Sequence, residues 1–333
     1  MTSSILSVKC TNIPNDVPQV SDFAVEAITL PDNLTGTLVQ IKYLSIDPFL
    51  RLRIKGNHQS GSIQKGEIMS GPGIVELLED SAQHKKGTLL MGLIPWQEKA
   101  RIDTTALKPI PSIDQPSLAL GVLGMPGFTA WVGVNKLLTT KHLTEKDVVV
   151  VSAASGVVGS MVGHFIQSMT NAKVIGIAGS EEKCNWVTGT LGWDGCINYK
   201  TTDLGMALKQ QAQQGISIYF DNVGGSVLNA VMENLAVGAQ VLLCGLAQQY
   251  NISKPIALHN IGALIGSRAS IKGMIIYDHV MHYPEFYQAV LPEYHAGKIK
   301  YKETKLKGIS SAIDAMITQF KGENFGKLII EVG

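Results

Sequence analysis

Hydrophobic positions in roughly the first third of the chain occur in short runs separated by turn residues. Three of these runs are GTLVQIKYLSI, GEIMSGPGIVELLE and KGTLLMGLIPWQEKARI. Apolar and polar residues alternate in them only partly, and glycine and proline punctuate them, which is typical of strands in a small, curved domain. Residues 1 to about 120 are therefore predicted to form a mostly β domain.

The pattern changes after about residue 121, where apolar strands alternate with segments of helix length. The predicted strands are VVVVSA, AKVIGIAGS, GCINY, ISIYFDNV, AQVLLCG and SIKGMIIY, and the predicted helices cover 156–170, 181–191, 203–214 and 225–235. Strands that are hydrophobic on both faces and separated by helices indicate a doubly wound parallel sheet.

Two late segments, EYHAGKIKYKETKL and GKLIIEV, read as strands that return to the first domain. We therefore expect an α/β protein of two domains. Residues 123–290 form the sheet-and-helix domain, and residues 1–122 and 291–333 together form the other.

The composition fits a folded protein and excludes some partners. Of 333 residues, 45% are hydrophobic and 17% charged, and chains of this length usually divide into domains. The net charge is +1, so neither nucleic acid nor an anionic membrane is an expected partner. Residues 148–172 contain no Asp, Glu, Lys or Arg, but glycines and serines interrupt them, which favours a buried strand and helix over a membrane span.

The cysteines and the first residues suggest a compartment. Cys10, Cys184, Cys196 and Cys244 lie far apart in the sequence without a Cys-x-x-Cys motif. They predict neither a disulfide framework nor a thiolate zinc site and fit a reducing compartment. The start, MTSSILSVKC, has neither the basic residues nor the apolar core of a secretion signal, so a cytoplasmic location is expected.

The segment VVVVSAASGVVGS predicts a strand, a tight corner and a helix that begins near Gly156. The unpaired N–H groups at a helix N-terminus favour an anion. Gly156 and Gly159 would let a pyrophosphate approach the backbone, although Ala153 stands where the first glycine of the dinucleotide fingerprint usually lies. The alternative is a corner whose glycines serve helix packing alone.

The end of the second strand indicates which dinucleotide is bound. It is Gly179–Ser180 rather than a carboxylate, and Lys183 follows one helical turn later. A strand that ends in small residues with a cation nearby favours binding of a 2′-phosphate, and therefore of NADP(H). An NAD site has an acidic residue at this position instead. Glu181 and Glu182 are typical of a first helical turn. The alternative for Lys183 is a solvated helix charge.

Polar residues also close the fourth and fifth predicted strands. Asn222 in YFDNVGG and Tyr250 in CGLAQQYN stand beyond carboxyl ends of strands, where open parallel sheets bind ligands. The alternatives are that Asp221 and Asn222 form an Asx turn that caps the next helix, and that Tyr250 is an amphipathic packing residue.

Eight segments resemble, in the same order, the motifs of one family. They are GVLGMPGFTAW, SAASGVVGS, GIAGSEEKCNW, LGWDGCINYK, YFDNVGG, CGLAQQYN, IKGMIIYDH and GENFGK, with YLSIDPFLR in the N-terminal half. The chain resembles the zinc-independent medium-chain dehydrogenases/reductases, in particular their prostaglandin reductase / alkenal-one double-bond reductase branch. The resemblance implies a central Rossmann domain that binds NADP(H), a GroES-like catalytic domain formed by both chain ends, and a homodimer joined through sheet edges.

The resemblance also implies roles for individual residues. The implied cofactor contacts are the pyrophosphate loop of Gly156, Val157, Val158 and Gly159, the 2′-phosphate contacts Lys183 and Tyr199, then Asn222 and Asn324, and the segments 244–250 and 274–280 with Cys244, Gly245, Leu246, Tyr250, Met274, Ile275 and Ile276. Phe49 replaces a tyrosine that faces the substrate carbonyl in relatives, which leaves the substrate class open. Met274 replaces a phenylalanine, and Ser155 an alanine.

No metal site is predicted. The segment GEIMSGPGIVE has no histidine where the zinc alcohol dehydrogenases carry Gly-His-Glu, and the cysteines are not grouped. His279 and His282 are three residues apart, but surface or interface histidines are the expected explanation. No Gly-x-Ser-x-Gly elbow indicates a hydrolase.

The predicted chemistry is therefore one that hydride attack alone can start. A conjugated enone meets this condition, because hydride addition to its β carbon moves negative charge to the carbonyl oxygen. The protein must then supply a hydrogen-bond donor to that oxygen and a proton for the α carbon. Tyr250 is the candidate donor and Tyr277 the second, with a ribose hydroxyl or water as alternative proton sources.

We predict an NADPH-dependent reductase of the double bond of 2-alkenals and enones that acts on small or lipid-derived electrophiles. Two alternatives stay open. One is an NADPH:quinone oxidoreductase of the same superfamily, and the other is a non-catalytic NADPH-binding sensor or structural protein.

Overall fold

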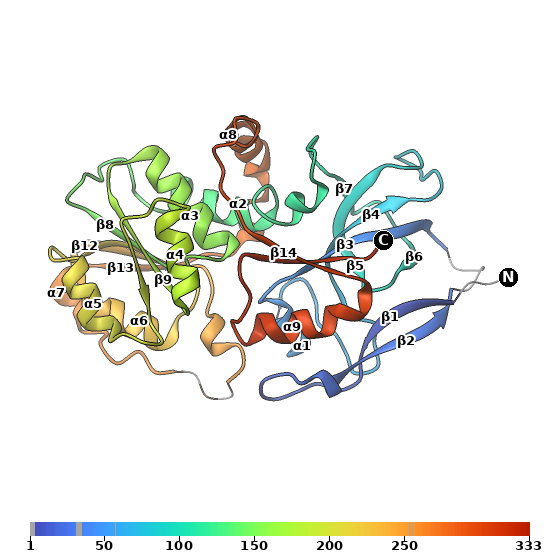
Figure 1. The fold of residues 1–333 in the computed structure, drawn as a ribbon, viewed down its shortest axis with the longest axis horizontal. Helices are drawn as coiled ribbons and strands as arrows, with labels where there is room; N and C mark the ends of the chain where they lie inside the picture. The colour runs from blue at the N-terminus through green and yellow to red at the C-terminus, as the bar shows by residue number, and fades with distance from the viewer. Residues whose placement is uncertain (1–3, 31–34, 57, 253, 255) are drawn as a thin grey trace. The chain divides into compact units, whose positions relative to one another are not determined.

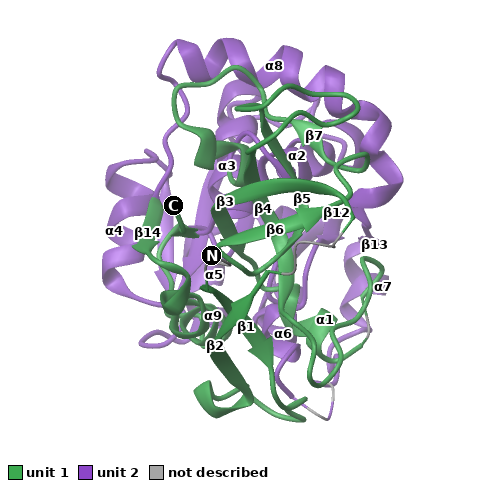
Figure 2. Ribbon diagram, turned by 90° about the vertical axis from the view of Figure 1, so that its right-hand side faces the viewer, with its two compact units in different colours: residues 1–121, 303–333 green, residues 122–302 purple. Residues whose placement is uncertain are grey.

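The chain divides into two compact units. The computed structural model describes residues 4–30, 35–56, 58–252, 254 and 256–333. Unit 1 comprises residues 1–121 and 303–333, and unit 2 comprises residues 122–302 (Figure 2). The division after residue 121 lies next to the expected boundary at 122, whereas the expected return at residue 291 falls inside a helix, and the chain returns to unit 1 at Glu303.

Unit 1 consists mainly of strands. They are β1 (Ser4–Cys10), β2 (Phe23–Thr29), β3 (Thr37–Ile46), β4 (Ser70–Leu77), β5 (Leu89–Pro95), β6 (Lys99–Ile102), β7 (Lys108–Pro109), β14 (Glu303–Lys307) and β15 (Lys327–Glu331). The helices are α1 (Leu50–Ile54) and α9 (Ala312–Phe320), with short 3₁₀ segments η1 (Val20–Asp22), η2 (Pro116–Leu120) and η6 (Ile309–Ser311).

Both ends of the chain build the main sheet of unit 1, as predicted. Its order is β14-β15-β3-β4-β5-β7, with β6 also paired to β3, while β1 and β2 form a separate antiparallel pair. The C-terminal strand β15 runs antiparallel to β3, with Ile330 opposite Leu44. Both of these side chains are fully buried, and Met316 of α9 belongs to the same core. The GroES-like unit therefore needs its C-terminal segment to close its core.

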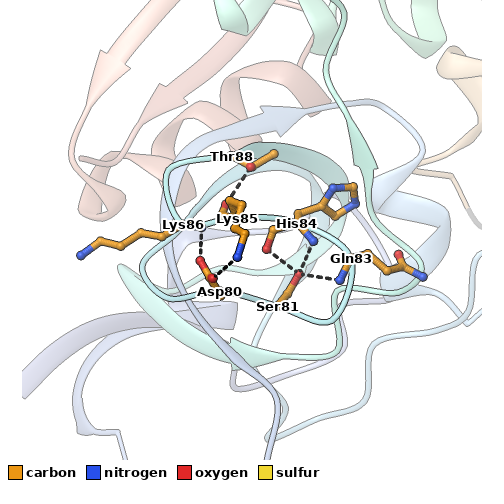
Figure 3. Close-up of polar contacts among 7 residues, drawn as sticks. All are labelled: Asp80, Ser81, Gln83, His84, Lys85, Lys86 and Thr88. Carbon is orange, nitrogen blue, oxygen red and sulfur yellow. Dashed lines mark hydrogen bonds and ion pairs between the residues drawn. The ribbon is translucent and has the colours of Figure 1, made fainter.

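The loop between β4 and β5 is held by its own side chains (Figure 3). Asp80 accepts hydrogen bonds from Nζ of Lys85 at 2.7 Å and from the backbone N–H of Lys86 at 2.9 Å. The backbone N–H of His84 donates to Oγ of Ser81 at 3.0 Å. These local bonds replace strand pairing in the loop and give it a defined shape at the surface.

Unit 2 alternates strands and helices. Its strands are β8 (Val148–Ser152), β9 (Lys173–Ala178), β10 (Gly195–Asn198), β11 (Ile216–Asp221), β12 (Leu235–Leu243) and β13 (Ser270–Gly273). Its helices are α2 (Met125–Val132), the π-helix η3 (Gly133–Leu137), α3 (Val157–Met169), α4 (Glu181–Gly189), α5 (Leu204–Gln211), α6 (Gly225–Met232), α7 (Ala263–Ser267) and α8 (Tyr283–His295), with 3₁₀ segments η4 (Ala247–Gln249) and η5 (Ile276–His282).

The sheet of unit 2 is the doubly wound parallel sheet that the sequence predicts. Its order is β10-β9-β8-β11-β12-β13, and every neighbouring pair is parallel. Val148 and Val150 of β8 share a buried cluster with residues of α5 and α6, so alternation sends Val149 and Val151 to the opposite face. Figure 1 shows α2 and α3 on one side of this sheet and α5, α6 and α7 on the other. No helix in the described residues is long and apolar enough to cross a bilayer.

Two predicted strands are only partly strands. SIKGMIIY forms β13 as far as Gly273, and the chain then leaves the sheet and enters η5 at Ile276. EYH at residues 293–295 is the last turn of α8, because the apolar spacing of that helix, with buried Phe286 and Val290, continues into it. Only residues 303–307 of that late segment pair as a strand.

Gly163 in the middle of α3 makes room for a buried tryptophan. A Cβ at position 163 would lie 1.9 Å from Cζ2 of Trp193, and Trp193 is 4% exposed. We expect Gly163→Ala to lower the free energy of unfolding by about 1–3 kcal/mol through overpacking, as measured by urea-induced unfolding. Gly189→Ala is the matched control, since no atom lies within 4 Å of its added Cβ. Equal stability of the two variants would contradict this packing role.

Candidate functional site

The strand order of unit 2 reverses between β8 and β11. From β8 the chain first proceeds to β9 and β10 on one side, and then returns to β11 on the other side of β8. In open parallel sheets, ligands bind beyond the carboxyl ends of the strands at this reversal. The two strands end here at Ser152 and Asp221, so the residues that follow them form the candidate site.

The corner between β8 and α3 explains the altered fingerprint. Ala153 has φ +49°, a left-handed conformation that glycine adopts without strain. The backbone N–H of Gly156 donates to the carbonyl oxygen of Ala153 at 2.9 Å. A Cβ on Gly159 would lie only 2.4 Å from that same oxygen. Gly159 is therefore required for the tight approach of the helix to the corner.

The N-terminus of α3 has no side-chain cap. Its N-cap residue is Gly156, which has no side chain to accept the N–H groups of the first turn, and no acidic residue lies in that turn. Among the described residues, no acceptor is assigned to the N–H groups of Val157, Val158 and Gly159. Ser180 and Asp203, by contrast, cap α4 and α5 with their side chains. The corner thus presents donors and the positive end of a helix dipole to an anion.

The carboxyl end of β9 brings together two of the predicted residues. Oγ of Ser180 accepts the backbone N–H of Lys183 at 3.3 Å and so begins α4. Gly179 lies beside the ring of Tyr199, since a Cβ there would be 3.5 Å from the tyrosine hydroxyl. That same Cβ would lie 3.3 Å from Cε of Lys200. Lys200 is a second cation at this strand end, which the sequence analysis missed although it directly follows Tyr199.

A buried hydrogen-bond network joins the ends of β8 and β11. Oδ1 of Asp221 accepts from Oγ of Ser152 at 3.1 Å and from the Tyr219 hydroxyl at 2.7 Å. It also accepts the backbone N–H groups of Val223 and Gly224, each at 2.9 Å. The Asx turn considered for this sequence is therefore present at Asp221. Its fully buried carboxylate also joins the turn to Ser152 and Tyr219, a link that the sequence alone did not indicate.

Asn222 bonds the end of β8 with both its backbone and its side chain. Its Nδ2 donates to the carbonyl oxygen of Ser152 at 2.8 Å, and its backbone N–H donates to Oγ of Ser152 at 2.9 Å. The side chain therefore crosses to the end of β8, next to the corner that precedes α3. The side-chain amide of Asn222 therefore lies at the reversal point between β8 and β11.

The buried carboxyl of Asp221 supports a prediction on stability. Asp221→Ala removes the acceptor of four donors and is expected to lower the free energy of unfolding by roughly 3 kcal/mol or more. Asp221→Asn keeps Oδ1 and should cost much less. Urea unfolding of both variants measures the difference, and equal losses would contradict the acceptor role of Oδ1.

The stability difference between Asp221→Asn and the wild type is expected to depend on pH. Burial raises the pKa of Asp221 above its ordinary value, against the opposing effect of the N–H groups of Gly224 and Val223. The folded state then binds this proton more tightly than the unfolded chain, so this contribution to stability is lost as pH rises above about 4 through the raised value. The asparagine side chain does not titrate, so the Asp221→Asn variant does not lose stability in this way. The stability of Asp221→Asn relative to the wild type should therefore increase as pH rises over that window, and a constant difference would contradict it.

The end of β12 lies against this network. The backbone N–H groups of Cys244 and Gly245 both donate to the carbonyl oxygen of Asp221, at 2.8 and 3.1 Å. The chain then passes through η4, and the backbone N–H of Leu246 donates to the hydroxyl of Tyr250 at 3.2 Å. A Cβ on Gly245 would lie 3.4 Å from that hydroxyl and 3.2 Å from the carbonyl oxygen of Asn222. Tyr250 therefore stands at the same sheet edge as Asn222.

Burial controls the protonation of the groups at this edge. It raises the pKa of the Tyr250 hydroxyl above its ordinary value. It also raises the pKa of the Cys244 thiol to about 12, with the charge of Asp221 adding to the effect. Tyr250 therefore keeps its proton at neutral pH. The hydroxyl oxygen accepts the backbone N–H of Leu246, and the hydroxyl proton is donated to no residue in the described part of the chain.

The segment after β13 continues along the edge next to β12. The backbone N–H of Met274 donates to the carbonyl oxygen of Leu243 at 3.0 Å. Ile275 is exposed, and Ile276 and Tyr277 are partly buried at the start of η5. Burial raises the pKa of Tyr283 in α8, and the nearby hydroxyls of Tyr287 and Tyr277 add to this rise.

Two predicted site residues belong to unit 1. Phe49 precedes α1 and stacks on His58 with ring centroids 4.8 Å apart. It also packs against the core of unit 1. Asn324 lies in the turn before β15, where its Nδ2 donates to the carbonyl oxygen of Gly326 at 3.1 Å. The substrate-side and cofactor roles of these two residues remain predictions.

All four cysteines are free thiols, but two of them lie close together in space. Cys184 and Cys196 are separated by twelve positions in the sequence, and their sulfurs are 2.9 Å apart, because α4 folds back beside β10. No cluster of three or more His, Cys, Asp or Glu side chains suited to a metal ion occurs among the described residues. His279 and His282 lie together in η5 with stacked rings.

Comparisons with known proteins match nearly the whole chain. A family described as zinc-binding dehydrogenase matches residues 157–294, and one described as the N-terminal domain of oxidoreductase matches residues 7–110. The chain is 36% identical to an NADP(+)-dependent 2-alkenal reductase of Nicotiana tabacum, over 96% of this chain and 95% of that protein. It is 35% identical to (+)-pulegone reductase of Mentha piperita, over 96% of each.

A solved structure has the same fold over the same length. The crystal structure of CurA from Vibrio vulnificus in complex with NADPH has a TM-score of 0.90 and 34% sequence identity, and the match covers 98% of this chain and 99% of that one. At this level of identity and coverage, the similarity extends to both units.

Proposed function

The chain belongs to the zinc-independent medium-chain dehydrogenases/reductases, in their alkenal and prostaglandin reductase branch, and from this premise we propose that it reduces the double bond of α,β-unsaturated aldehydes and ketones. It is an NADP(H)-dependent oxidoreductase. The observation that carries the proposal is the uncapped N-terminus of α3 at the strand reversal, with the protonated hydroxyl of Tyr250 at the same sheet edge.

The residues of unit 2 fit an NADP(H) molecule. The N–H groups at Val157, Val158 and Gly159 suit a pyrophosphate, and the glycines at the corner leave its approach open. At the end of β9, Lys183 and Tyr199 are the residues that would hold a 2′-phosphate, and the strand ends in Gly179 rather than a carboxylate. Asn222 and the segment from Cys244 to Tyr250 would border the nicotinamide.

Bound NADPH supplies a hydride, and the chain's own groups must stabilise the charge that then develops on the substrate. In an enone that charge develops on the carbonyl oxygen after attack at the β carbon. Tyr250 is suited to stabilise it, because burial keeps its hydroxyl protonated, and a donor aimed at developing charge lowers the barrier. Phe49 has no hydroxyl, so we assign the hydrogen bond to Tyr250 rather than to that position.

The experiment is a screen of NADPH consumption. Purified protein is mixed with NADPH and, in separate reactions, with alkenals, enones, oxo-lipids with a conjugated enone and quinones. We expect the alkenals and enones to be consumed, with the saturated carbonyl compound as product by mass spectrometry. Faster turnover of 1,2-naphthoquinone than of any enone would favour the quinone reductase. Binding of NADPH with no turnover in any reaction would favour a sensor.

We also propose that the protein is a homodimer joined through the edge of its parallel sheet. β13 is the last strand of that sheet, and apolar side chains near it in sequence are exposed, with Ile265 at 82% and Met281 at 66%. An unpaired strand edge with apolar neighbours is suited to pair with a second copy.

A double variant tests this assembly. In the double variant Ile265→Glu with Met281→Glu, dimer formation would bury two glutamate charges from each chain, which is unfavourable. We therefore expect the mass, measured by size-exclusion chromatography with light scattering, to fall from about twice 35.8 kDa to 35.8 kDa. Met206→Glu is the control, since this exposed residue lies on α5 and not next to β13. A wild-type mass of 35.8 kDa would exclude the dimer.

A further inference from the structure

Two thiols meet between helix α4 and the edge strand β10 of unit 2. Cys184 lies in the first turn of α4, and Cys196 is the second residue of β10. The thiol of Cys196 donates to Sγ of Cys184, and the two sulfur atoms are 2.9 Å apart. The pair lies over Gly176 of β9, where an added Cβ would be 3.1 Å from Sγ of Cys196. The absence of a side chain at Gly176 thus leaves the space that this sulfur occupies.

The positions of these sulfurs require little movement for a covalent bond. A disulfide has its sulfurs about 2.05 Å apart, so the thiols need to approach by less than about 1 Å. Rotation of the two side chains can supply a movement of that size, without displacement of α4 from β10. The other two thiols, Cys10 in unit 1 and Cys244 at the end of β12, have no sulfur partner among the described residues.

We propose that Cys184 and Cys196 are a site of reversible oxidation that forms an intramolecular disulfide. The oxidant is a peroxide. One sulfur attacks hydrogen peroxide and becomes a sulfenic acid with release of water, and the other sulfur displaces the hydroxyl group as a second water. Two thiols and one peroxide thus give one disulfide and two waters, with the sulfurs oxidised and the peroxide reduced. A dithiol reductant reverses the reaction by exchange.

The surroundings of the pair set its reactivity. Cys184 is 6% exposed, whereas Cys196 is partly exposed and gives an oxidant access. Burial raises the pKa of both thiols, and the hydrogen bond from Cys196 partly offsets this rise for Cys184. Thiolates are then scarce, and the first step with peroxide is slow. The second step is fast because the partner sulfur is already in place.

The product would tie α4 to β10. The bond closes a loop from residue 184 to residue 196, and Lys183 and Tyr199 lie just outside its two ends. Opening of α4 away from β10 then requires reduction, so the backbone amides of α4 should exchange hydrogen more slowly in the oxidised protein.

The experiment maps the thiols of the full chain. Native protein is treated with hydrogen peroxide, which catalase then removes. The protein is denatured and alkylated with iodoacetamide, then reduced and labelled with N-ethylmaleimide. We expect the free thiols to fall from four to two, with the maleimide label on Cys184 and Cys196 and acetamide on Cys10 and Cys244. Hydrogen exchange in α4 should slow in the same sample and recover after dithiothreitol.

Two variants control the result. Cys196→Ser should give no pair of maleimide-labelled cysteines and no slowing of exchange in α4 after the same treatment, whereas Cys244→Ser should still lose two free thiols. Acetamide on both Cys184 and Cys196 in the treated wild type would overturn the proposal. So would their separate oxidation to sulfinic acids, or a disulfide that joins either of them to another cysteine or another chain.

Discussion

Replacement of Tyr250 by phenylalanine is expected to lower the turnover of an enone by roughly 100-fold or more. The hydroxyl of Tyr250 accepts the N–H of Leu246 and keeps its own proton, because burial raises its pKa. Phenylalanine removes the donor to the oxygen on which charge develops and leaves the ring in place. The measurement is kcat for NADPH consumption with an enone that the wild-type protein reduces.

The controls separate catalysis from structure. Loss of the hydroxyl also deprives the N–H of Leu246 of its acceptor, which costs about 1 kcal/mol of stability, so the thermal midpoint is measured alongside. The NADPH Kd should remain within a few-fold of the wild-type value. Tyr277→Phe is the matched comparison, since Tyr277 is the second candidate donor and lies in η5 near Tyr283 of α8. An unchanged kcat for Tyr250→Phe would exclude Tyr250 from the reaction, and a loss confined to Tyr277→Phe would transfer the role.

The parts of the fold that local patterns determine were predictable. The four valines of β8 are buried on both faces of the sheet, and only a parallel sheet covered by helices makes such a run favourable. The corner after Ser152 was also predictable, because Gly156 and Gly159 mark a strand-to-helix turn. The left-handed conformation of Ala153 was not, since alanine rarely adopts it and the sequence suggests no strain there.

Contacts across the sequence were harder to predict. Nothing in the spacing of Cys184 and Cys196 places their sulfurs together; the turn between α4 and β10 does so. Asp221 looked like a turn residue, and its four donors come from β8, β11 and the following loop. Only the strand order brings Ser152 to it. Lys200 was missed because its position beside Gly179 depends on how β10 ends against β9.

In our proposal Lys183 supplies the positive charge that binds the 2′-phosphate of NADPH. Lys183→Ala is expected to weaken NADPH binding roughly 10- to 150-fold, which corresponds to a charge-assisted contact of about 1.5–3 kcal/mol. NADH binding should hardly change, because NADH lacks the 2′-phosphate. Lys183 lies in the first turn of α4, one turn beyond the small residues that end β9. The measurement is the Kd of each cofactor by titration of protein fluorescence.

The ratio of the two affinities makes the test independent of folding. A variant that merely loosens α4 would weaken NADPH and NADH together, because both share the pyrophosphate and the corner at Gly156. Lys209→Ala, at an exposed position on α5, removes the same charge away from the end of β9 and should leave both affinities unchanged. Lys200→Ala measures the second cation beside Gly179. If Lys183→Ala lowers both affinities equally, Lys183 does not read the 2′-phosphate, and a selective loss in Lys200→Ala alone would assign that contact to Lys200.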